Sequence, residues 1–443
     1  MKINNSNSNT IDIITLGCSK NLVDAEQLSR QLEANGYKVR YNPENKVSDI
    51  VIINTCAFIG DAKAESINTI LQYGKLRKKR IVSKLYVMGC LSERYLHDLP
   101  NEMPEVDKFY GKFSWKEVIA DLGKSYRPQL AHQRLLSTPL HYAYLKIAEG
   151  CNRTCSYCAI PIITGSYQSR PIEEIEAEVQ WLVCQGVKEF QIIAQDLSWY
   201  GMDLYKTLKL PELVQRLSDI DGVKWLRLHY AYPAHFPFDL LPVIRERENV
   251  CNYLDIALQH ISDKMLRMMR RNITGQETYD LIARLREEAP GIHLRTTLLV
   301  GHPGETEDDF EQLQEFVRQV RFERMGGFTY SDEEGTYSNR HYKDKIPFAT
   351  KQARLDKLMA IQQEISLEIN RSKIGQTLQV IIDREEAEHY IGRTEFDSPE
   401  IDPEVLIPKE KQLFTGEFYP VRIVDAEAFD LHGKVWFSRQ MIH

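Results

Sequence analysis

Three cysteines stand close together in the segment EGCNRTCSYCAIP. They are Cys151, Cys155 and Cys158, which form a Cys-x3-Cys-x2-Cys run. Three thiolates on one short loop can hold three corners of a four-iron, four-sulfur cube, because soft sulfur ligands suit the iron of such clusters. The alternative is a zinc knuckle or three buried thiols, but structural zinc prefers paired Cys-x2–4-Cys units or a nearby His, and neither completes this run. The spacing therefore favours an iron–sulfur cluster with three protein ligands.

Such a cluster leaves its fourth iron without a protein ligand. An open iron can chelate a small molecule, and for this cysteine spacing that molecule is usually S-adenosylmethionine. Reductive cleavage of the bound sulfonium would give a carbon radical that takes hydrogen from an unactivated C–H bond, which no side-chain acid or base can do. The run thus predicts an enzyme whose difficult chemistry belongs to its cofactor.

A second set of three cysteines shares a different feature, because each ends a predicted buried strand. These are Cys18, Cys56 and Cys90, at the ends of 11–18, 49–56 and 84–90. Ligands of open α/β sheets lie outside the carboxyl ends of the strands, so neighbouring strands can bring three thiolates to one place. We interpret this as a second three-cysteine cluster with one free iron. The alternative is three independent core cysteines in similar strands.

Composition excludes several classes of protein. The 443 residues are 43% hydrophobic and 27% charged, as in soluble globular proteins, and no run approaches the roughly 18 apolar residues of a membrane span. The polar start, MKINNSNSNT, lacks the apolar core of a signal peptide, so we expect a disordered tail on a cytoplasmic protein. The net charge of −7 argues against an extended nucleic-acid surface. Eight cysteines in a reducing cytosol indicate metal ligands plus spare core thiols, with Cys184 and Cys251 as the spare ones.

The pattern of apolar residues predicts an α/β protein of three domains. The first alternates strands with helices, two of them at 24–36 and 61–74, and should form an open parallel sheet. The second has six strands, each followed by a helix, and this pattern predicts a partial (βα)6 TIM-like barrel. Cys151 should then lie at the carboxyl end of a barrel strand. The third has short alternating runs typical of a small antiparallel β-barrel of the oligonucleotide-binding kind. The predicted boundaries are 1–10 for the tail, 11–125 for the first domain, 126–138 for a linker, 139–372 for the second domain and 373–443 for the third. A basic run at 75–80 is expected to be solvated surface.

Together, the two triads and three domains resemble the radical S-adenosylmethionine (radical SAM) methylthiotransferases, over essentially the whole chain after residue 10. Within that family the local motifs resemble the RimO type, which methylthiolates an aspartate of the small-subunit ribosomal protein S-twelve. The motifs are LGCSKNLVDAE (16–26), NTCAFI (54–59), GCLSERY (89–95), GCNRTCSYCAIP (150–161), YLDIALQH (253–260), GHPGET (301–306) and FTYSDEEGT (328–336). Relatives that modify adenosine in transfer RNA typically carry Gln-Met or similar residues in place of Ser19-Lys20.

The resemblance implies roles for individual residues. It makes Cys151, Cys155 and Cys158 ligands of a radical-generating 4Fe-4S cluster, and Cys18, Cys56 and Cys90 ligands of an auxiliary 4Fe-4S cluster. Tyr157 falls where an aromatic residue lies near the adenine of S-adenosylmethionine, although simple packing explains it equally well. Gly301 matches a Gly-rich element that lets the backbone approach the adenine, unless it serves only a tight turn. Glu305 can equally be an acid at a helix start. The departures from the family pattern are Thr164 and Gln168, where arginines are common, and His302, where Phe is usual; none is a cluster ligand.

The third domain resembles the TRAM module, which often binds RNA and should then be basic. Residues 371–443 instead carry nine Lys and Arg against fourteen Asp and Glu, a balance of −5. Such a surface favours a basic protein over RNA, so RNA contact is expected only through the ribosome. An acidic surface that serves only solubility is the alternative.

The resemblance also implies the reaction. One S-adenosylmethionine donates a methyl group to a sulfide on the auxiliary cluster, a second is cleaved to an adenosyl radical, and the methylthio group reaches the aspartate β-carbon. The expected partners are ribosomal protein S-twelve, free or in the small subunit, an electron donor such as flavodoxin or ferredoxin, and a sulfur donor. The nearest alternative is a transfer-RNA adenosine methylthiotransferase (MiaB-like). A non-catalytic iron–sulfur or zinc-binding module on the ribosome is the alternative from another class.

Overall fold

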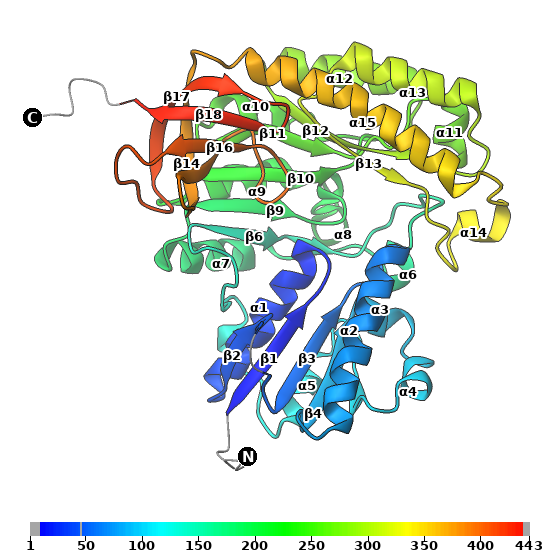
Figure 1. Ribbon diagram of the computed structural model, residues 1–443, viewed down its shortest axis with the longest axis vertical. Helices are drawn as coiled ribbons and strands as arrows, with labels where there is room; N and C mark the ends of the chain where they lie inside the picture. Colours follow the sequence, from blue (N-terminus) through cyan, green and yellow to red (C-terminus); the bar gives the residue numbers. More distant parts are fainter. Residues whose placement is uncertain (1–8, 45–46, 437–443) are drawn as a thin grey trace, which may run out of the picture.

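The computed structural model describes residues 9–44 and 47–436, which form three domains packed against one another (Figure 1). Of the predicted tail, residues 1–8 lie outside the described residues, and Thr10 already belongs to the first strand, β1. Among the described residues, no helix has the length and apolar character that crossing a bilayer requires.

The N-terminal domain is a five-stranded parallel sheet in the order β2-β1-β3-β4-β5. Its strands are β1 (Thr10–Thr15), β2 (Lys38–Tyr41), β3 (Ile50–Thr55), β4 (Lys84–Gly89) and β5 (Lys108–Phe109). Its helices are α1 (Ser19–Ala34), α2 (Gly60–Lys78), α3 (Cys90–Arg94), α4 (Leu99–Glu102) and α5 (Trp115–Asp121). The central strands are rich in Ile and Val because apolar clusters cover both faces of the sheet.

Two helix boundaries differ from the predicted ones. Helix α1 begins five residues before the predicted 24, directly after Cys18. Helix α2 does not stop at Gly74 as predicted but continues to Lys78, because Leu76 packs against the apolar core one turn after Tyr73. The basic run at 75–80 therefore lies partly on this helix.

The central domain is a six-stranded parallel sheet in the order β13-β12-β11-β10-β9-β6, with β6 and β13 as open edges. Its strands are β6 (Tyr142–Lys146), β9 (Glu189–Ile193), β10 (Trp225–Ala231), β11 (Val250–Ile256), β12 (His293–Val300) and β13 (Arg324–Thr329), with a short pair β7 (Ala148–Glu149) and β8 (Gln168–Ser169). The longer helices are α7 (Ile172–Cys184), α9 (Leu210–Ser218), α10 (Leu240–Glu246), α12 (Gly275–Glu288), α13 (Glu307–Val320) and α15 (Phe348–Arg371). The shorter ones are α6 (Ile160–Thr164), α8 (Met202–Tyr205), α11 (Asp263–Met268) and α14 (Tyr337–His341), and 3-10 turns lie at Pro128–Leu130 and Leu197–Trp199.

The two faces of the central sheet have opposite character. Apolar side chains such as Phe190, Leu228 and Leu254 point to the helices and form the main core. The alternating positions on the same strands form what we call the inner face, which carries polar and charged side chains. These are Glu189, Gln191, Arg227, His229, Asp255 and Arg295. The period of two in a strand places them together on one side.

The C-terminal domain is a closed barrel in the order β14-β15-β16-β18-β17. Its strands are β14 (Thr377–Glu385), β15 (His389–Thr394), β16 (Glu404–Pro408), β17 (Phe418–Ala426) and β18 (Asp430–Val435). The barrel departs from the predicted antiparallel pattern at one pair, because β16 and β18 run parallel. The hairpin of β17 and β18 returns β18 in the direction of β16, and this contact closes the barrel.

Buried ion pairs connect the C-terminal barrel to the inner face. Arg393 Nη2 lies 2.7 Å from Glu189 Oε2, and both side chains are buried. Arg227 Nη2 donates to the carbonyl of Thr394 at 3.3 Å. The barrel thus covers the inner face at the end where its strands begin.

The predicted linker at 126–138 is fixed to both flanking domains. Arg134 is fully buried between two carboxylates, with Nη1 3.1 Å from Glu26 on α1 and Nε 2.9 Å from Glu178 on α7. This buried arginine makes the linker part of the domain interface.

Candidate functional site: two cysteine triads at one domain interface

The first triad lies where the N-terminal strands end. Cys18 precedes α1, Cys56 follows β3, and Cys90 is the first residue of α3, so each cysteine lies just after its strand instead of on the strand as predicted. Asn21 joins these turns: its Nδ2 donates to the carbonyls of Leu16 and Thr55, and its Oδ1 lies 3.5 Å from Cys90 Sγ. The fully buried amide holds the three turns together.

Close packing within this triad requires a glycine. Gly17 has φ +89°, and a Cβ built there would lie 2.6 Å from Cys56 Cβ and 2.7 Å from Cys56 Sγ. Burial raises the pKa of the Cys56 thiol, and it raises that of Cys90 to about 12, with smaller contributions from Cys18 and Cys56. The contact at Gly17 brings the turn before Cys18 directly against Cys56.

The second triad lies on the loop between β7 and α6, and Ser156 anchors this loop. The Ser156 N–H donates to the carbonyl of Met269 at 3.0 Å, and its own carbonyl accepts from the Ser338 N–H at 2.7 Å. Burial raises the pKa of Cys151 to about 11 and of Cys158 to about 12. Burial of this kind disfavours free thiolates, so a cationic iron centre is the partner that this donor set suits.

Two arginines bring positive charge to the second triad. Arg271 donates from Nη1 to Cys155 Sγ at 3.2 Å and to the Tyr157 hydroxyl at 3.4 Å. The ring of Tyr232 lies between Arg271 and Arg153, at 4.1 and 4.0 Å from their guanidinium carbons. These cations would offset the negative charge of thiolate ligands.

The two triads adjoin through the packing of α3 against α6. Cys90 and Leu91 belong to the same apolar cluster as Ala159 and Ile163, which follow Cys158. Lys112 lies close enough to Cys90 to oppose the rise in its pKa, and its ammonium lies 2.7 Å from Glu149, two residues before Cys151. The interface between the first two domains therefore holds both triads.

The donor sets fit clusters better than single ions. Among the described residues, no three His, Cys, Asp or Glu side chains converge as the ligands of one metal ion do. A four-iron cube binds each cysteine at a different corner, so its ligands need not converge on a point. Cysteines alone make up each triad, which is the ligand type that iron–sulfur clusters take.

The structure also places the other predicted site residues. Tyr157 is half-buried beside Arg271, with its ring 6.4 Å from that of His302. Gly301 has φ +76°, and the side on which a Cβ would project is filled by Lys351, 2.3 Å away. Its N–H donates to Glu305 Oε2 at 2.7 Å, so Glu305 supports this turn instead of starting α13. Burial raises the pKa of Glu305 to about 7.

The three departures from the family pattern occupy different surroundings. His302 is fully buried; its Nδ1 lies 3.0 Å from the carbonyl of Pro303, so Nε2 is free to accept from the hydroxyls of Ser156 and Ser338. It thus helps to fix the cysteine loop. Thr164 is buried at the end of α6, where its hydroxyl donates to the carbonyl of Ile160, whereas Gln168 is exposed.

The spare cysteines and the basic run have mixed outcomes. Cys251 is buried as predicted. Cys184 is exposed, so its prediction as a core thiol is wrong: it ends α7 outside the buried stripe that includes Val179 and Leu182. The basic run at 75–80 is largely exposed, with Arg77 paired to Asp107.

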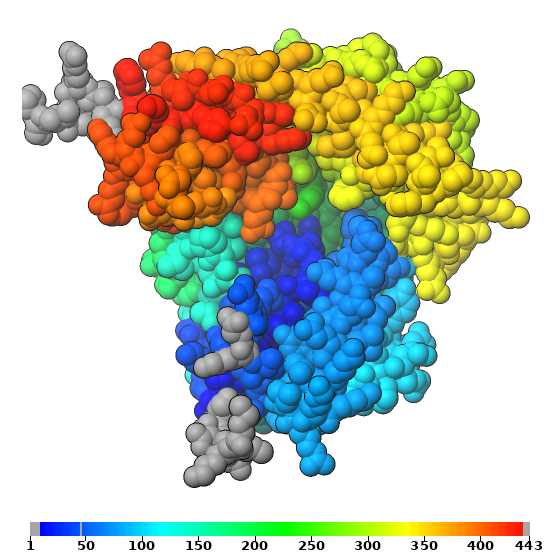
Figure 2. Space-filling view, viewed as in Figure 1, coloured from blue at the N-terminus to red at the C-terminus, as the bar shows by residue number. Residues whose placement is uncertain are grey.

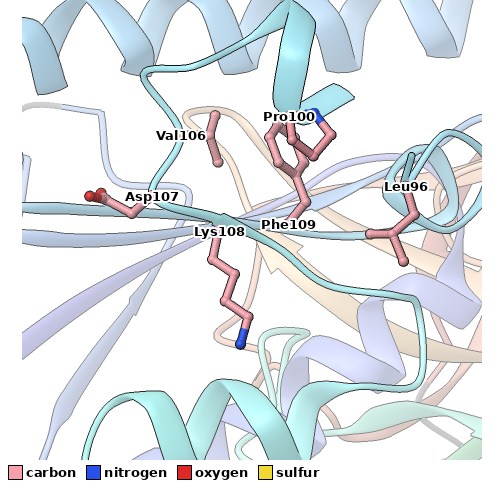
Figure 3. A pocket seen from close by; sticks show the side chains of 6 residues that line it. All are labelled: Leu96, Pro100, Val106, Asp107, Lys108 and Phe109. Atoms are coloured by element: carbon pink, nitrogen blue, oxygen red, sulfur yellow. The ribbon is translucent and has the colours of Figure 1, made fainter. Parts of the chain in front are cut away.

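A pocket of about 310 Å3 lies beside the edge strand β5 (Figure 3). Its lining residues are Leu96, Pro100, Val106, Asp107, Lys108 and Phe109. It contains no cysteine and takes no part in the candidate site.

Comparison with known proteins matches each domain to a family model. The model "Uncharacterized protein family UPF0004" covers residues 10–111, "Radical SAM superfamily" covers 145–317, and "TRAM domain" covers 374–435. A ribosomal protein uS12 methylthiotransferase RimO from Parabacteroides distasonis is 66% identical over 427 residues, which are 96% of this chain and 99% of the relative. The chain belongs to the RimO family. RimO relatives from Bacteroides fragilis and Flavobacterium johnsoniae are 65% and 49% identical over 96% and 98% of this chain.

A solved structure has a similar fold. The radical S-adenosylmethionine methyltransferase TsrM from Kitasatospora setae aligns with a TM-score of 0.52 and 13% identity, covering 72% of this chain and 73% of its own. At this identity the likeness concerns the fold alone. The predicted family, fold class and enzyme class, a radical SAM methylthiotransferase, are confirmed, and the radical SAM domain implies S-adenosylmethionine and one 4Fe-4S cluster.

Proposed function

We propose that this protein adds a methylthio group to the β-carbon of an aspartate in ribosomal protein uS12. The observation that carries the proposal is the meeting of two cysteine triads at one domain interface, in a chain 60–66% identical to several relatives named ribosomal protein uS12 methylthiotransferase. The transfer joins a sulfur group to an unactivated carbon, so both halves of the chemistry must reach one substrate atom. Two triads at a single interface satisfy this requirement.

The cluster ligands follow from this arrangement. Cys151, Cys155 and Cys158 would hold the 4Fe-4S cluster that binds S-adenosylmethionine, with Tyr157 and Gly301 near the adenine, and Cys18, Cys56 and Cys90 would hold the auxiliary cluster. When bound, these groups supply the sulfur, the methyl group and the one-electron chemistry. The chain itself anchors both cysteine sets: Asn21 fixes the turns of the first, and Ser156 fixes the loop of the second.

The acidic C-terminal barrel favours a protein substrate. Several of its carboxylates are neutralised by ion pairs, as in Arg384 with Glu404, but Glu388 and Asp425 are exposed, and no ion pair to either occurs among the described residues. The excess of five negative charges over 371–443 repels phosphates and attracts a basic ribosomal protein. This supports uS12, free or in the small subunit, over transfer RNA.

The remaining partners follow from the reaction. Cleaving S-adenosylmethionine consumes an electron, which a flavodoxin or ferredoxin would deliver, and each turnover consumes a sulfur atom, which a sulfur donor would replace. With a ribosomal protein as its substrate, the protein would act in the cytoplasm.

The test uses anaerobically reconstituted, reduced protein with S-adenosylmethionine and a sulfide source. One sample receives a peptide from the aspartate-containing loop of uS12, and the other receives an adenosine-modified transfer-RNA anticodon stem-loop. Mass spectrometry should show a gain of about one CH2S unit on the peptide aspartate, as expected for a replaced hydrogen. A gain on the RNA alone would refute the proposed substrate while leaving the cluster chemistry in place.

A further inference from the structure

A buried lysine lies beside the first triad without a carboxylate partner. Lys20, two residues after Cys18, is only 9% exposed. Its ammonium lies 3.8 Å above the centre of the Tyr230 ring, and among residues 9–44 and 47–436 no ion pair to it occurs. A buried ammonium is expected to be paired, so its resting place on an aromatic face leaves it available to an incoming anion.

Strained backbone holds the Tyr230 ring in place. Between β10 and β11 the register slips: Leu228 pairs with Leu254 but Ala231 pairs with Ile256, so β10 contains an extra residue. Tyr230 lies in this bulge with φ +66°, a conformation that bulky side chains rarely adopt. Its ring lies 5.8 Å from that of its neighbour His229, although consecutive strand residues normally face opposite sides. The bulge therefore turns Tyr230 to the inner face, beneath Lys20.

A buried carboxylate on the same face has weak partners only. Asp255 is 1% exposed, and no side chain donates a hydrogen bond to its oxygens. The Tyr230 N–H is close enough to lower its pKa, and Arg295 Nη1 and His229 Nδ1 lie 3.7 and 3.9 Å away. Burial raises the pKa of Asp255 to about 6, and Arg295 and Lys20 partly oppose that rise. By contrast, Glu189 on the same face is fully paired, with Arg227 and Arg393. The inner face thus pairs Glu189 closely with two arginines, but the ion-pair contact nearest to Asp255 is 3.7 Å long, so Asp255 can accept a further hydrogen bond.

Lys20 and Asp255 face the interface between the N-terminal and central domains, which also holds both triads. Tyr230 and Asp255 stand near the carboxyl ends of their strands, and Lys20 reaches them from the N-terminal domain. Figure 2 shows a hollow between the blue N-terminal domain and the orange and yellow segments above it. Two aromatic side chains are exposed: Phe58, which follows Cys56 by two residues, and Phe328 on β13. The start of α2 lies beside the segment after β13, because a Cβ built on Gly60 would lie 3.7 Å from Ser331 Oγ.

We infer that Lys20 binds the side-chain carboxylate of the target aspartate, and that Asp255 accepts a hydrogen bond from a backbone N–H of the same peptide. This inference rests on the proposed function and names the residues that select an acidic side chain. A peptide aspartate supplies both missing partners, an anion and an adjacent donor. A neutral nucleobase would leave the lysine unpaired in a buried site, at the cost of its desolvation.

The test is peptide binding to the anaerobically reconstituted protein, measured with a fluorescent uS12 loop peptide and its Asp-to-Asn analogue. The wild-type protein should bind the Asp peptide roughly 10- to 100-fold more tightly, the range of a charge-assisted hydrogen bond. In Lys20→Met this preference should fall to near one, and Lys20→Arg should restore most of it. Asp255→Leu should weaken both peptides alike and keep the preference, because it removes a backbone contact.

Controls separate binding from folding and from cluster loss. Lys116, exposed and 4.7 Å above the Tyr126 ring, is a lysine–tyrosine pair far from the cysteines in sequence, so Lys116→Met should change nothing. Iron content should match the wild type in every variant, and Lys116→Met should also keep wild-type cleavage of S-adenosylmethionine. A preserved Asp preference in Lys20→Met, or no preference in the wild type, overturns the inference. A wild-type preference without methylthiolation of the peptide overturns the proposed function alone.

Discussion

Replacing Glu149 with Gln should destabilise the interface that holds the two triads. Glu149 lies in a buried group of four charges: its oxygens are 2.7 Å from Lys112 and 2.9 Å from Lys146, and Asp24 on α1 pairs with Lys146. The two lysines hold the pKa of Glu149 well below its usual range, against the effect of burial. In Glu149→Gln two buried ammonium groups would share one carboxylate.

The expected cost is about 3 kcal/mol. Removing one partner of a buried pair costs roughly 3–5 kcal/mol, and the lower end applies because the Glu149 side chain is 14% exposed. The assay is urea unfolding followed by circular dichroism at pH 7. Because the folded pKa of Glu149 is depressed, its contribution is present above about pH 4.5 and is lost as pH falls, so the variant and the wild type should converge in acid.

A double-mutant cycle with Lys112→Met tests the reasoning. The double variant removes one charge of each sign, so it should be more stable than the sum of the single changes by about 1–3 kcal/mol. Additive effects, or a Glu149→Gln cost below about 1 kcal/mol, would refute the account of this interface.

Three other changes have expected outcomes. Gly17→Ala should cut bound iron to about half, because its Cβ would collide with Cys56. The control Gly36→Ala has the same φ of +89° but open space around the Cβ, so it should keep all the iron. Equal iron content in the two variants would contradict the packing argument. Arg134→Met should cost about 3 kcal/mol in urea unfolding, because buried Glu26 loses its ion pair while Glu178 is left with Arg170. A change below about 1 kcal/mol would disprove this. Glu305 has a raised pKa of about 7, so its ionisation lowers the free energy of unfolding by roughly 3 kcal/mol as pH rises from 4.5 to 7. Glu305→Gln should flatten this pH dependence, and an unchanged profile in the variant would contradict the prediction.

The cysteine sets could be predicted because their geometry is local or follows from topology. Cys151 and Cys158 share one loop, so their spacing alone indicates a common site. Cys18, Cys56 and Cys90 are far apart in sequence, but parallel strands bring their carboxyl ends to the same edge. An error of one or two residues in a predicted strand boundary changes neither prediction.

The supporting residues could not be predicted, because they depend on contacts between domains. Lys112 and Glu149 have no motif, and only the packing of two domains makes them a pair. The bulge that turns Tyr230 inward is a slip in register, which period-two patterns do not reveal. Arg271 approaches Cys155 from more than a hundred residues away in sequence, without any signal in its charged segment.

The most direct test of the two-cluster account replaces each cysteine triad with alanine and measures iron together with products. The wild type should bind about eight iron atoms and each triple variant about four, as two four-iron clusters require. The variant lacking Cys18, Cys56 and Cys90 should still convert S-adenosylmethionine to 5′-deoxyadenosine but leave the uS12 peptide without its methylthio group. The variant lacking Cys151, Cys155 and Cys158 should form neither product. Full iron content, or a methylthiolated peptide, in the variant without the first triad would contradict the account.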